Sequence, residues 1–133
     1  MPVGTVLFSS RAPIGYIAIA SAELTTNQGF KSIIPNENIG TAFIYYYLKY
    51  LTPTIENMAS GSTFKEISSS GMREIPAFIP DKDTIVKFNK FCNPIFKLQE
   101  KIELENIKLT KLRDTLLPKL MSGELDVSNV EIW

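Results

Sequence analysis

The sequence predicts an α+β fold in which a small mixed α/β domain is followed by a long helix that forms a coiled coil. Three short runs rich in β-branched and aromatic residues precede a helical segment within residues 1–80. From residue 84 to residue 117, apolar residues instead recur every seven positions over about four heptads. We therefore expect a partial domain in residues 1–80, a long helix in residues 81–122 and a tail in residues 123–133.

Three strands are expected, at residues 4–8, 14–20 and 30–34. The first two are separated by a polar loop that contains Arg11, and this arrangement predicts an antiparallel hairpin. Pro35 closes the third run, because proline cannot donate a hydrogen bond to a neighbouring strand.

A helix is expected at residues 41–51, where apolar residues recur at spacings of three and four. Thr52-Pro53 predicts the start of a separate helical turn, since proline is favoured at the first helical position. The residues expected to share the buried face of the helix are Phe43, Ile44, Tyr47, Leu48 and Leu51.

Two further segments precede the long helix. Thr63 and Glu66 have the spacing of a capping box, so a short helix is expected to begin at Thr63. Residues 73–79 alternate loosely and contain Pro76, which favours an edge strand or an extended linker.

The long helix presents a narrow apolar seam. Eight of the nine seam positions counted in sevens from Phe88 are apolar. Roughly 34 residues at about 1.5 Å each span on the order of 50 Å, more than the width of a small domain. Part of the helix should therefore pair with a partner helix; the alternative is that it packs on its own domain. The predicted interface comprises Phe88, Phe91, Ile95, Leu98, Ile102, Leu109, Leu112 and Leu116.

The seam has several irregular features. Glu105 occupies a seam position, where a charge weakens pairing but can specify register. Pro94 lacks an N–H donor, so a kink or break is expected near it. Lys101, Lys108 and Arg113 flank the seam and would bring like charges together in a pair of identical helices.

The ends of the long helix have recognisable signals. Asp81 and Asp83 place negative charge at its beginning, where the helix dipole favours it. Pro118 and Gly123 are expected to end it.

Composition limits the possible functions. The chain has 133 residues with 14 basic and 14 acidic side chains, so it lacks the overall positive field of a non-specific nucleic-acid binder. Any DNA contact must rest on a local surface. Histidine is absent, which removes the commonest general base and the commonest metal ligand. We expect no catalytic residue, no metal site and no enzyme activity.

The cysteine content and the hydropathy of the sequence indicate the cellular compartment of the protein. The single Cys92 excludes an internal disulfide and fits a reducing compartment. We expect no signal peptide before the first strand, and no apolar run in the sequence approaches the length of a membrane span. We expect a cytoplasmic protein without membrane contact.

Two polar loops contain candidate DNA-binding residues. Asn27 and Gln28 carry amides of the kind that pair with an adenine edge, although a turn closed by Asn27 with a positive φ at Gly29 explains the same residues. Thr63 and Lys65 could hold a phosphate at a helix N-terminus, or could simply cap that helix.

Several motifs follow one another along the chain. They are Ser10-Arg11-Ala12-Pro13-Ile14-Gly15, Thr26-Asn27-Gln28-Gly29-Phe30, Gly61-Ser62-Thr63-Phe64-Lys65-Glu66-Ile67-Ser68, Ile75-Pro76 with Ile79-Pro80, Leu112-Arg113-Asp114, and Leu116-Leu117-Pro118-Lys119-Leu120-Met121-Ser122-Gly123-Glu124-Leu125. In this order they resemble the specificity subunit of type I restriction-modification systems, over nearly the whole chain.

The resemblance implies part of a DNA target-recognition domain in residues 1–80 and a spacer helix in residues 81–122. In this family each recognition domain reads one part of a split DNA site, and the spacer helices set the distance between the parts. The subunit does no chemistry itself and needs no cofactor. It carries methylation subunits, which use S-adenosylmethionine, and through them motor-endonuclease subunits.

The resemblance also sets the expected partners. These are double-stranded DNA, a methylation subunit and, through it, a motor-endonuclease subunit, with self-association or pairing to another specificity half through the long helix. The chain resembles a single half, and because its first strand begins at Gly4 we expect it to be the distal part of a recognition domain.

The residues selected as DNA-facing are Arg11, Asn27, Gln28, Thr63 and Lys65. One alternative is a helical docking protein that does not read DNA, and another is a silent recombination cassette. An enzyme is disfavoured by the missing histidine and by the lack of a clustered acid–base pair.

Overall fold

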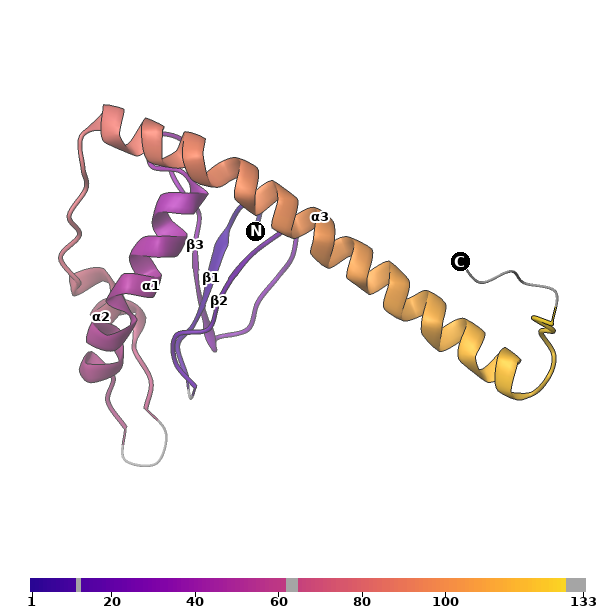
Figure 1. Ribbon diagram of the computed structural model, residues 1–133. Coiled ribbons are helices and arrows are strands. Elements are labelled where there is room, and N and C mark those ends of the chain that lie inside the picture. The colour runs from indigo at the N-terminus through magenta and orange to yellow at the C-terminus, as the bar shows by residue number, and fades with distance from the viewer. Residues whose placement is uncertain (12, 62–64, 129–133) are drawn as a thin grey trace. The chain divides into compact units, whose positions relative to one another are not determined.

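The computed structural model describes residues 1–11, 13–61 and 65–128 and has an α+β fold (Figure 1), as the sequence predicts. The elements, in order, are β1 (Val6–Ser9), β2 (Ile17–Ile19), β3 (Phe30–Ile33), α1 (Thr41–Met58), α2 (Ser69–Glu74) and α3 (Lys82–Met121). The chain divides into two compact units, Met1–Ile95 and Phe96–Trp133, which are described separately.

The three strands form one antiparallel sheet in the order β2-β1-β3. Val6 at the start of β1 pairs with Ile19 on one side and Ile33 on the other. The predicted hairpin of the first two strands is confirmed, but β2 is shorter than residues 14–20 because the chain first turns through Gly15 at φ 94°. Gly15 donates its N–H to the Ser9 carbonyl at 3.1 Å, which closes that turn.

Helix α1 packs against the sheet (Figure 1) and supplies two of the five buried residues of the core cluster. Leu48 and Ile55 are buried with Val6 and Phe8 of β1 and with Ile67. The predicted apolar face is confirmed for Leu48 and for Ile44 and Leu51, which also pack against this core. Phe43 and Tyr47 are half-buried and stack on each other, with ring centroids 5.4 Å apart.

The predicted separate turn at Thr52-Pro53 is wrong, because α1 runs on through Pro53 to Met58. Proline removes one helical hydrogen bond, but Ile55 just beyond it is fully buried and holds the last turn on the core. The Thr52 hydroxyl also donates to the Leu48 carbonyl at 2.9 Å.

Helix α2 begins later than the capping-box spacing predicts. Thr63 lies outside the described residues, and Glu66 is not helical but pairs with Ser60 in an isolated bridge. The helix starts at Ser69 because Ser68 caps it, accepting a hydrogen bond from the Gly71 N–H at 3.0 Å. Residues 73–79 are predicted to form either an edge strand or an extended linker. The linker is confirmed for the part that follows α2, since residues 76–80 join no strand.

The first turns of α3 are capped and packed within the first unit. Asp81 accepts hydrogen bonds from the Thr84 N–H at 2.9 Å and from its hydroxyl at 2.7 Å. Phe88 meets the rings of Phe43 and Tyr46 on α1, with centroids 6.3 and 5.9 Å away. Phe88 is therefore a contact of its own domain, and its part in a partner interface stays a prediction.

The long helix continues past both of its interior prolines. It includes Pro94, so the expected break there is wrong, while a bend at Pro94 stays a prediction. It also runs beyond Pro118 to Met121, and Gly123 follows in the left-handed region at φ 74°. The Leu125 N–H bonds back to the Lys119 carbonyl at 3.1 Å and closes the C-terminal turn.

Candidate nucleic-acid interface

Three loops converge on Ser10, the buried residue that follows β1. Its N–H and its hydroxyl both donate to the Gly29 carbonyl, at 2.8 and 3.0 Å. Its own carbonyl accepts the Ile67 N–H at 3.1 Å, and Ile67 is buried in the core. Ser10 therefore ties the loop after β1 to the turn before β3 and to the segment before α2.

Arg11 and Lys31 share one carboxylate in this region. The Arg11 Nε donates to Glu66 Oε2 at 3.1 Å, and Lys31 Nζ lies 3.8 Å from Glu66 Oε1. The side chains of Arg11 and Glu66 are 49% and 38% exposed, and that of Lys31 is 15% exposed. Ion pairs this exposed contribute only about 0–1 kcal/mol to folding, so stability alone does not explain the grouping.

Asn27 closes a tight turn before β3. Its Oδ1 accepts the Gly29 N–H at 2.9 Å, so the turn predicted at this loop is confirmed. The predicted positive φ at Gly29 is wrong, since Gly29 is not among the glycines in the left-handed region. Glycine still suits the position, because a Cβ there would lie 3.0 Å from Asn27 Oδ1, a tight contact.

The turn separates the roles of the two amides. A bidentate contact with adenine uses both the oxygen and the nitrogen of an amide. The oxygen of Asn27 already has a partner, whereas Gln28 is exposed beside it. Gln28 is thus the amide that can reach a base without disturbing the turn.

The loop that contains Lys65 is closed by backbone bonds between its ends. Ser60 N–H donates to the Glu66 carbonyl at 3.2 Å, and Glu66 N–H donates to the Ser60 carbonyl at 2.9 Å. Lys65 is exposed next to Glu66, while Thr63 lies outside the described residues. Lys65 and Glu66 are not helical and α2 begins only at Ser69, so Lys65 does not lie at the helix N-terminus predicted as a phosphate site.

We call the group of polar and charged residues around Ser10 the three-loop cluster. The sequence does not identify two members, Lys31 and Glu66, because Lys31 lies on β3 and the spacing of Glu66 from Thr63 predicts a capping residue. The register that places Lys31 opposite Phe8 brings it toward Arg11, and no local motif signals that pairing. The cluster's described members are Arg11, Asn27, Gln28, Lys31, Lys65 and Glu66.

The predicted seam residues on α3 after Phe88 are mostly exposed. Phe91 is 72% exposed and Leu98 is 57% exposed, and Leu116 is half-buried. Ile95, Ile102, Leu109 and Leu112 are exposed as well. A contiguous run of such side chains in water is unusual for a folded chain.

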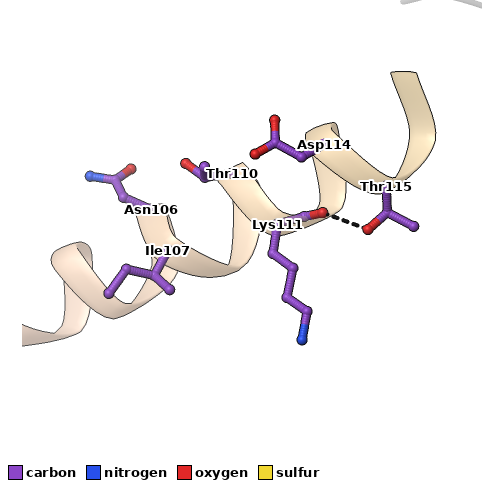
Figure 2. A pocket seen from close by; sticks show the side chains of 6 residues that line it. All are labelled: Asn106, Ile107, Thr110, Lys111, Asp114 and Thr115. Carbon is purple, nitrogen blue, oxygen red and sulfur yellow. Dashed lines mark hydrogen bonds between the residues drawn. The ribbon is translucent and has the colours of Figure 1, made fainter. Parts of the chain in front are cut away.

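The second unit also has a more polar face. A hollow of about 500 Å³ lies along the helix. Figure 2 shows the side chains that line it and the hydrogen bond that the Thr115 hydroxyl donates to the Lys111 carbonyl. The length of that bond is 2.7 Å. The residues that line it are Asn106, Ile107, Thr110, Lys111, Asp114 and Thr115. None of them is a predicted seam residue, so the seam and the hollow use different side chains.

Residues 1–11, 13–61 and 65–128 contain neither a candidate metal site nor a helix that could cross a membrane. Among these residues no three His, Cys, Asp or Glu side chains are grouped so that they could hold a metal ion. No helix in this part of the chain combines the length and apolar character needed to cross a membrane.

Comparison with known proteins gives a consistent family. The type I restriction modification DNA specificity domain matches residues 1–113. The MjaIX specificity subunit of Methanocaldococcus jannaschii is 37% identical over 113 residues, which cover 84% of this chain and 26% of that protein. The HindI specificity subunit of Haemophilus influenzae is 33% identical over 128 residues, which cover 94% of this chain and 28% of that protein.

A third relative, the MjaX specificity subunit of Methanocaldococcus jannaschii, is described as putative in its name and is 29% identical over 126 residues, or 29% of its length. The chain thus spans between a quarter and three tenths of the relatives it matches. These matches confirm the resemblance carried by the sequence motifs: the chain belongs to the type I restriction-modification DNA specificity domain family.

Proposed function

We propose that this chain recognises part of a split DNA site through the three-loop cluster. The observation that carries the proposal is the convergence at Ser10 of the loops that contain Arg11, Gln28 and Lys65. Base-reading side chains must be presented together on a rigid support, and bonds to the buried Ser10 provide that support. Thr63 precedes Lys65 by two residues in the sequence and is proposed as DNA-facing with it.

The members of the three-loop cluster suit different parts of DNA. An arginine can pair with the O6 and N7 of guanine or with a phosphate, and a glutamine can pair with adenine. Lys65 is suited to a phosphate, which fixes position without reading sequence. Because Glu66 offsets part of the local positive charge, we expect weak binding to DNA of arbitrary sequence and a shallow dependence on salt.

The long helix would act as the spacer and the docking element. Its exposed apolar seam supports pairing with another helix, from a second copy, another specificity half or a methylation subunit. Through the methylation subunit it would recruit the motor-endonuclease subunit. In this account the chain performs no catalysis, binds no cofactor and leaves the use of S-adenosylmethionine to its partner.

The experiment that tests DNA reading is a titration of the ¹⁵N-labelled full chain with a mixed-sequence duplex at low salt. NMR detects weak binding and reports which residues are affected. We expect shifts in the side-chain amides of Asn27 and Gln28 and in the backbone amides of Arg11 and Lys65. The side-chain amide of Asn106, in the second unit, serves as the control and should not move.

The same titration separates the proposal from a docking protein that does not read DNA. That second candidate is favoured by one observation, the length of exposed seam on α3. If the duplex leaves the three-loop cluster unshifted, or shifts only residues of α3, the chain does not read DNA and its function is docking.

A further inference from the structure

Glu66 is the one carboxylate among the described members of the three-loop cluster. It accepts the Arg11 Nε–H at 3.1 Å and lies 3.8 Å from Lys31 Nζ. We propose that Glu66 is a positioning residue for DNA recognition, which holds the Arg11 guanidinium by its Nε edge and offsets the charge of Lys31. This inference rests on the proposed function, because it concerns how the same surface meets DNA.

The backbone of Glu66 is fixed on both sides. Its N–H and carbonyl both bond to Ser60, at 2.9 and 3.2 Å, and it forms an isolated bridge with Arg11. The next residue, Ile67, is buried in the core and bonds to Ser10. The carboxylate therefore projects from a support that the fold determines, as an orienting group requires.

The hydrogen bond to Glu66 leaves most of the Arg11 guanidinium available. A guanidinium has five N–H donors in a rigid plane, and this bond uses only the one on Nε. No other described residue accepts a hydrogen bond from the Nη1 or Nη2 atoms of Arg11. These two groups can therefore make a bidentate contact with a guanine edge or a phosphate, while the Nε bond restricts the rotamers of a half-exposed side chain.

Glu66 also acts on DNA through its charge. A carboxylate beside Arg11 and Lys31 repels phosphates and reduces attraction to DNA of any sequence. Removing that charge should strengthen attraction to arbitrary DNA and at the same time release Arg11 from its orientation. A purely structural role predicts neither effect, and an ion pair this exposed adds little to stability.

The first part of the test is the orientation of Arg11 in the Glu66→Gln variant of the full chain. The chain has three arginines, Arg11, Arg73 and Arg113, so the NMR spectrum of the Nε–H groups contains three signals. We expect the Arg11 signal to move and to exchange faster with water in Glu66→Gln. Arg113, whose Nε donates to Asp114 at 2.8 Å, is the internal reference and should not change.

A matched variant controls for loss of one negative charge. Glu37 is exposed in the connection between β3 and α1. It follows the C-terminal end of β3, whereas Lys31 lies near the N-terminal end of that strand. Glu37→Gln should leave the Arg11 signal unchanged. The remaining amide spectrum reports that each variant is folded.

The second part measures binding of a fluorescein-labelled mixed-sequence duplex at low and moderate salt. One further phosphate neutralised steepens the salt slope by about 0.9, so the ratio of affinities at 50 and 200 mM salt should rise about 3.5-fold in Glu66→Gln. Glu37→Gln should match the wild type. An unchanged Arg11 signal, or an unchanged salt slope, in Glu66→Gln would overturn the inference.

The two proposals fail differently. Suppose that neither the wild-type chain nor Glu66→Gln binds the duplex, but the Arg11 signal moves in Glu66→Gln. Then the proposed recognition of DNA is wrong, although Glu66 does orient Arg11. If the wild type binds through the three-loop cluster and Glu66→Gln leaves both readouts unchanged, DNA reading stands and the role of Glu66 is wrong.

Discussion

The Asn27 side chain accepts a hydrogen bond of 2.9 Å from the N–H of Gly29, two residues along the same loop. The neighbouring Gln28 is exposed and takes no part in this bond. The two amides should therefore differ in what they do. Asn27 holds the turn, and Gln28 is available to a ligand.

Substitution of each amide by alanine tests this division. Asn27→Ala should lower the free energy of unfolding by about 0.5–1.5 kcal/mol, the usual contribution of one hydrogen bond. Gln28→Ala should leave stability unchanged and relax selectivity between duplexes that differ at the contacted base by about 1–3 kcal/mol. Urea unfolding and a duplex titration measure the two effects. Equal destabilisation by both variants, with DNA binding unchanged, would contradict the assignment.

The exposed seam on α3 predicts self-association of the isolated chain. Burial of a large apolar side chain contributes about 1.5–3 kcal/mol, which exceeds the about 0.2–0.5 kcal/mol of repulsion from each pair of like charges. The seam residues Ile102 and Leu109 are both exposed, so Ile102→Glu with Leu109→Glu should give a monomer. Sedimentation at micromolar concentration measures the mass, and by resemblance to the family we expect an antiparallel pair.

A matched substitution separates the seam from general apolar exposure. Ile107 is exposed on the face with the hollow of Figure 2 and is not a seam residue. Ile107→Glu should leave the association intact. A wild-type chain that stays monomeric under these conditions would refute self-pairing.

Absence of catalysis by the chain alone is the third prediction. The sequence has no histidine, and the described residues contain no group of side chains that could hold a metal. We expect no methyl transfer when the chain is incubated with S-adenosylmethionine and mixed DNA. Radiolabel transferred to DNA without an added methylation subunit would contradict this.

The N-terminal cap of α3 predicts a dependence of stability on pH. Hydrogen bonds from the Thr84 hydroxyl and then from the Thr84 N–H lower the pKa of Asp81 below its ordinary value of 3.8. A carboxyl whose pKa is lower in the folded state stabilises the fold above the unfolded pKa, and that contribution disappears as pH falls through the folded pKa.

Asp81→Asn should remove this contribution, so the difference in unfolding free energy between wild type and variant should shrink as the pH falls below 3.8. Urea unfolding at a series of pH values measures it. A difference that stays constant with pH would show that the charge of Asp81 does not stabilise the cap.

Local patterns in the sequence predicted most of the fold. Alternation and turn residues located the strands, and three- and four-residue spacings identified the face of α1 that contains Leu48. They failed where distant packing overrides a local signal. The buried Ile55 carries α1 through Pro53, and the anchoring of Ile67 in the core delays the start of α2 to Ser69.

The candidate site was only partly predictable for the same reason. Arg11, Gln28 and Lys65 were selected from three separate motifs, but the bonds through Ser10 that bring their loops together join residues far apart in the chain. The position of Glu66 beside Arg11 depends on those bonds. Sequence spacing alone therefore suggested a helix cap there.

The central claim is that the three-loop cluster contacts DNA. It is tested most directly by finding which cationic side chains contribute to DNA binding. Arg11→Ala and Lys65→Ala each remove one charge from the three-loop cluster, and Lys111→Ala removes one charge from the second unit. The measurement is the salt dependence of affinity for a mixed-sequence duplex. The account predicts that each cluster variant reduces the slope by about 0.9 and that Lys111→Ala leaves it unchanged. A reduced slope for Lys111→Ala alone, with Arg11→Ala and Lys65→Ala like the wild type, would contradict it.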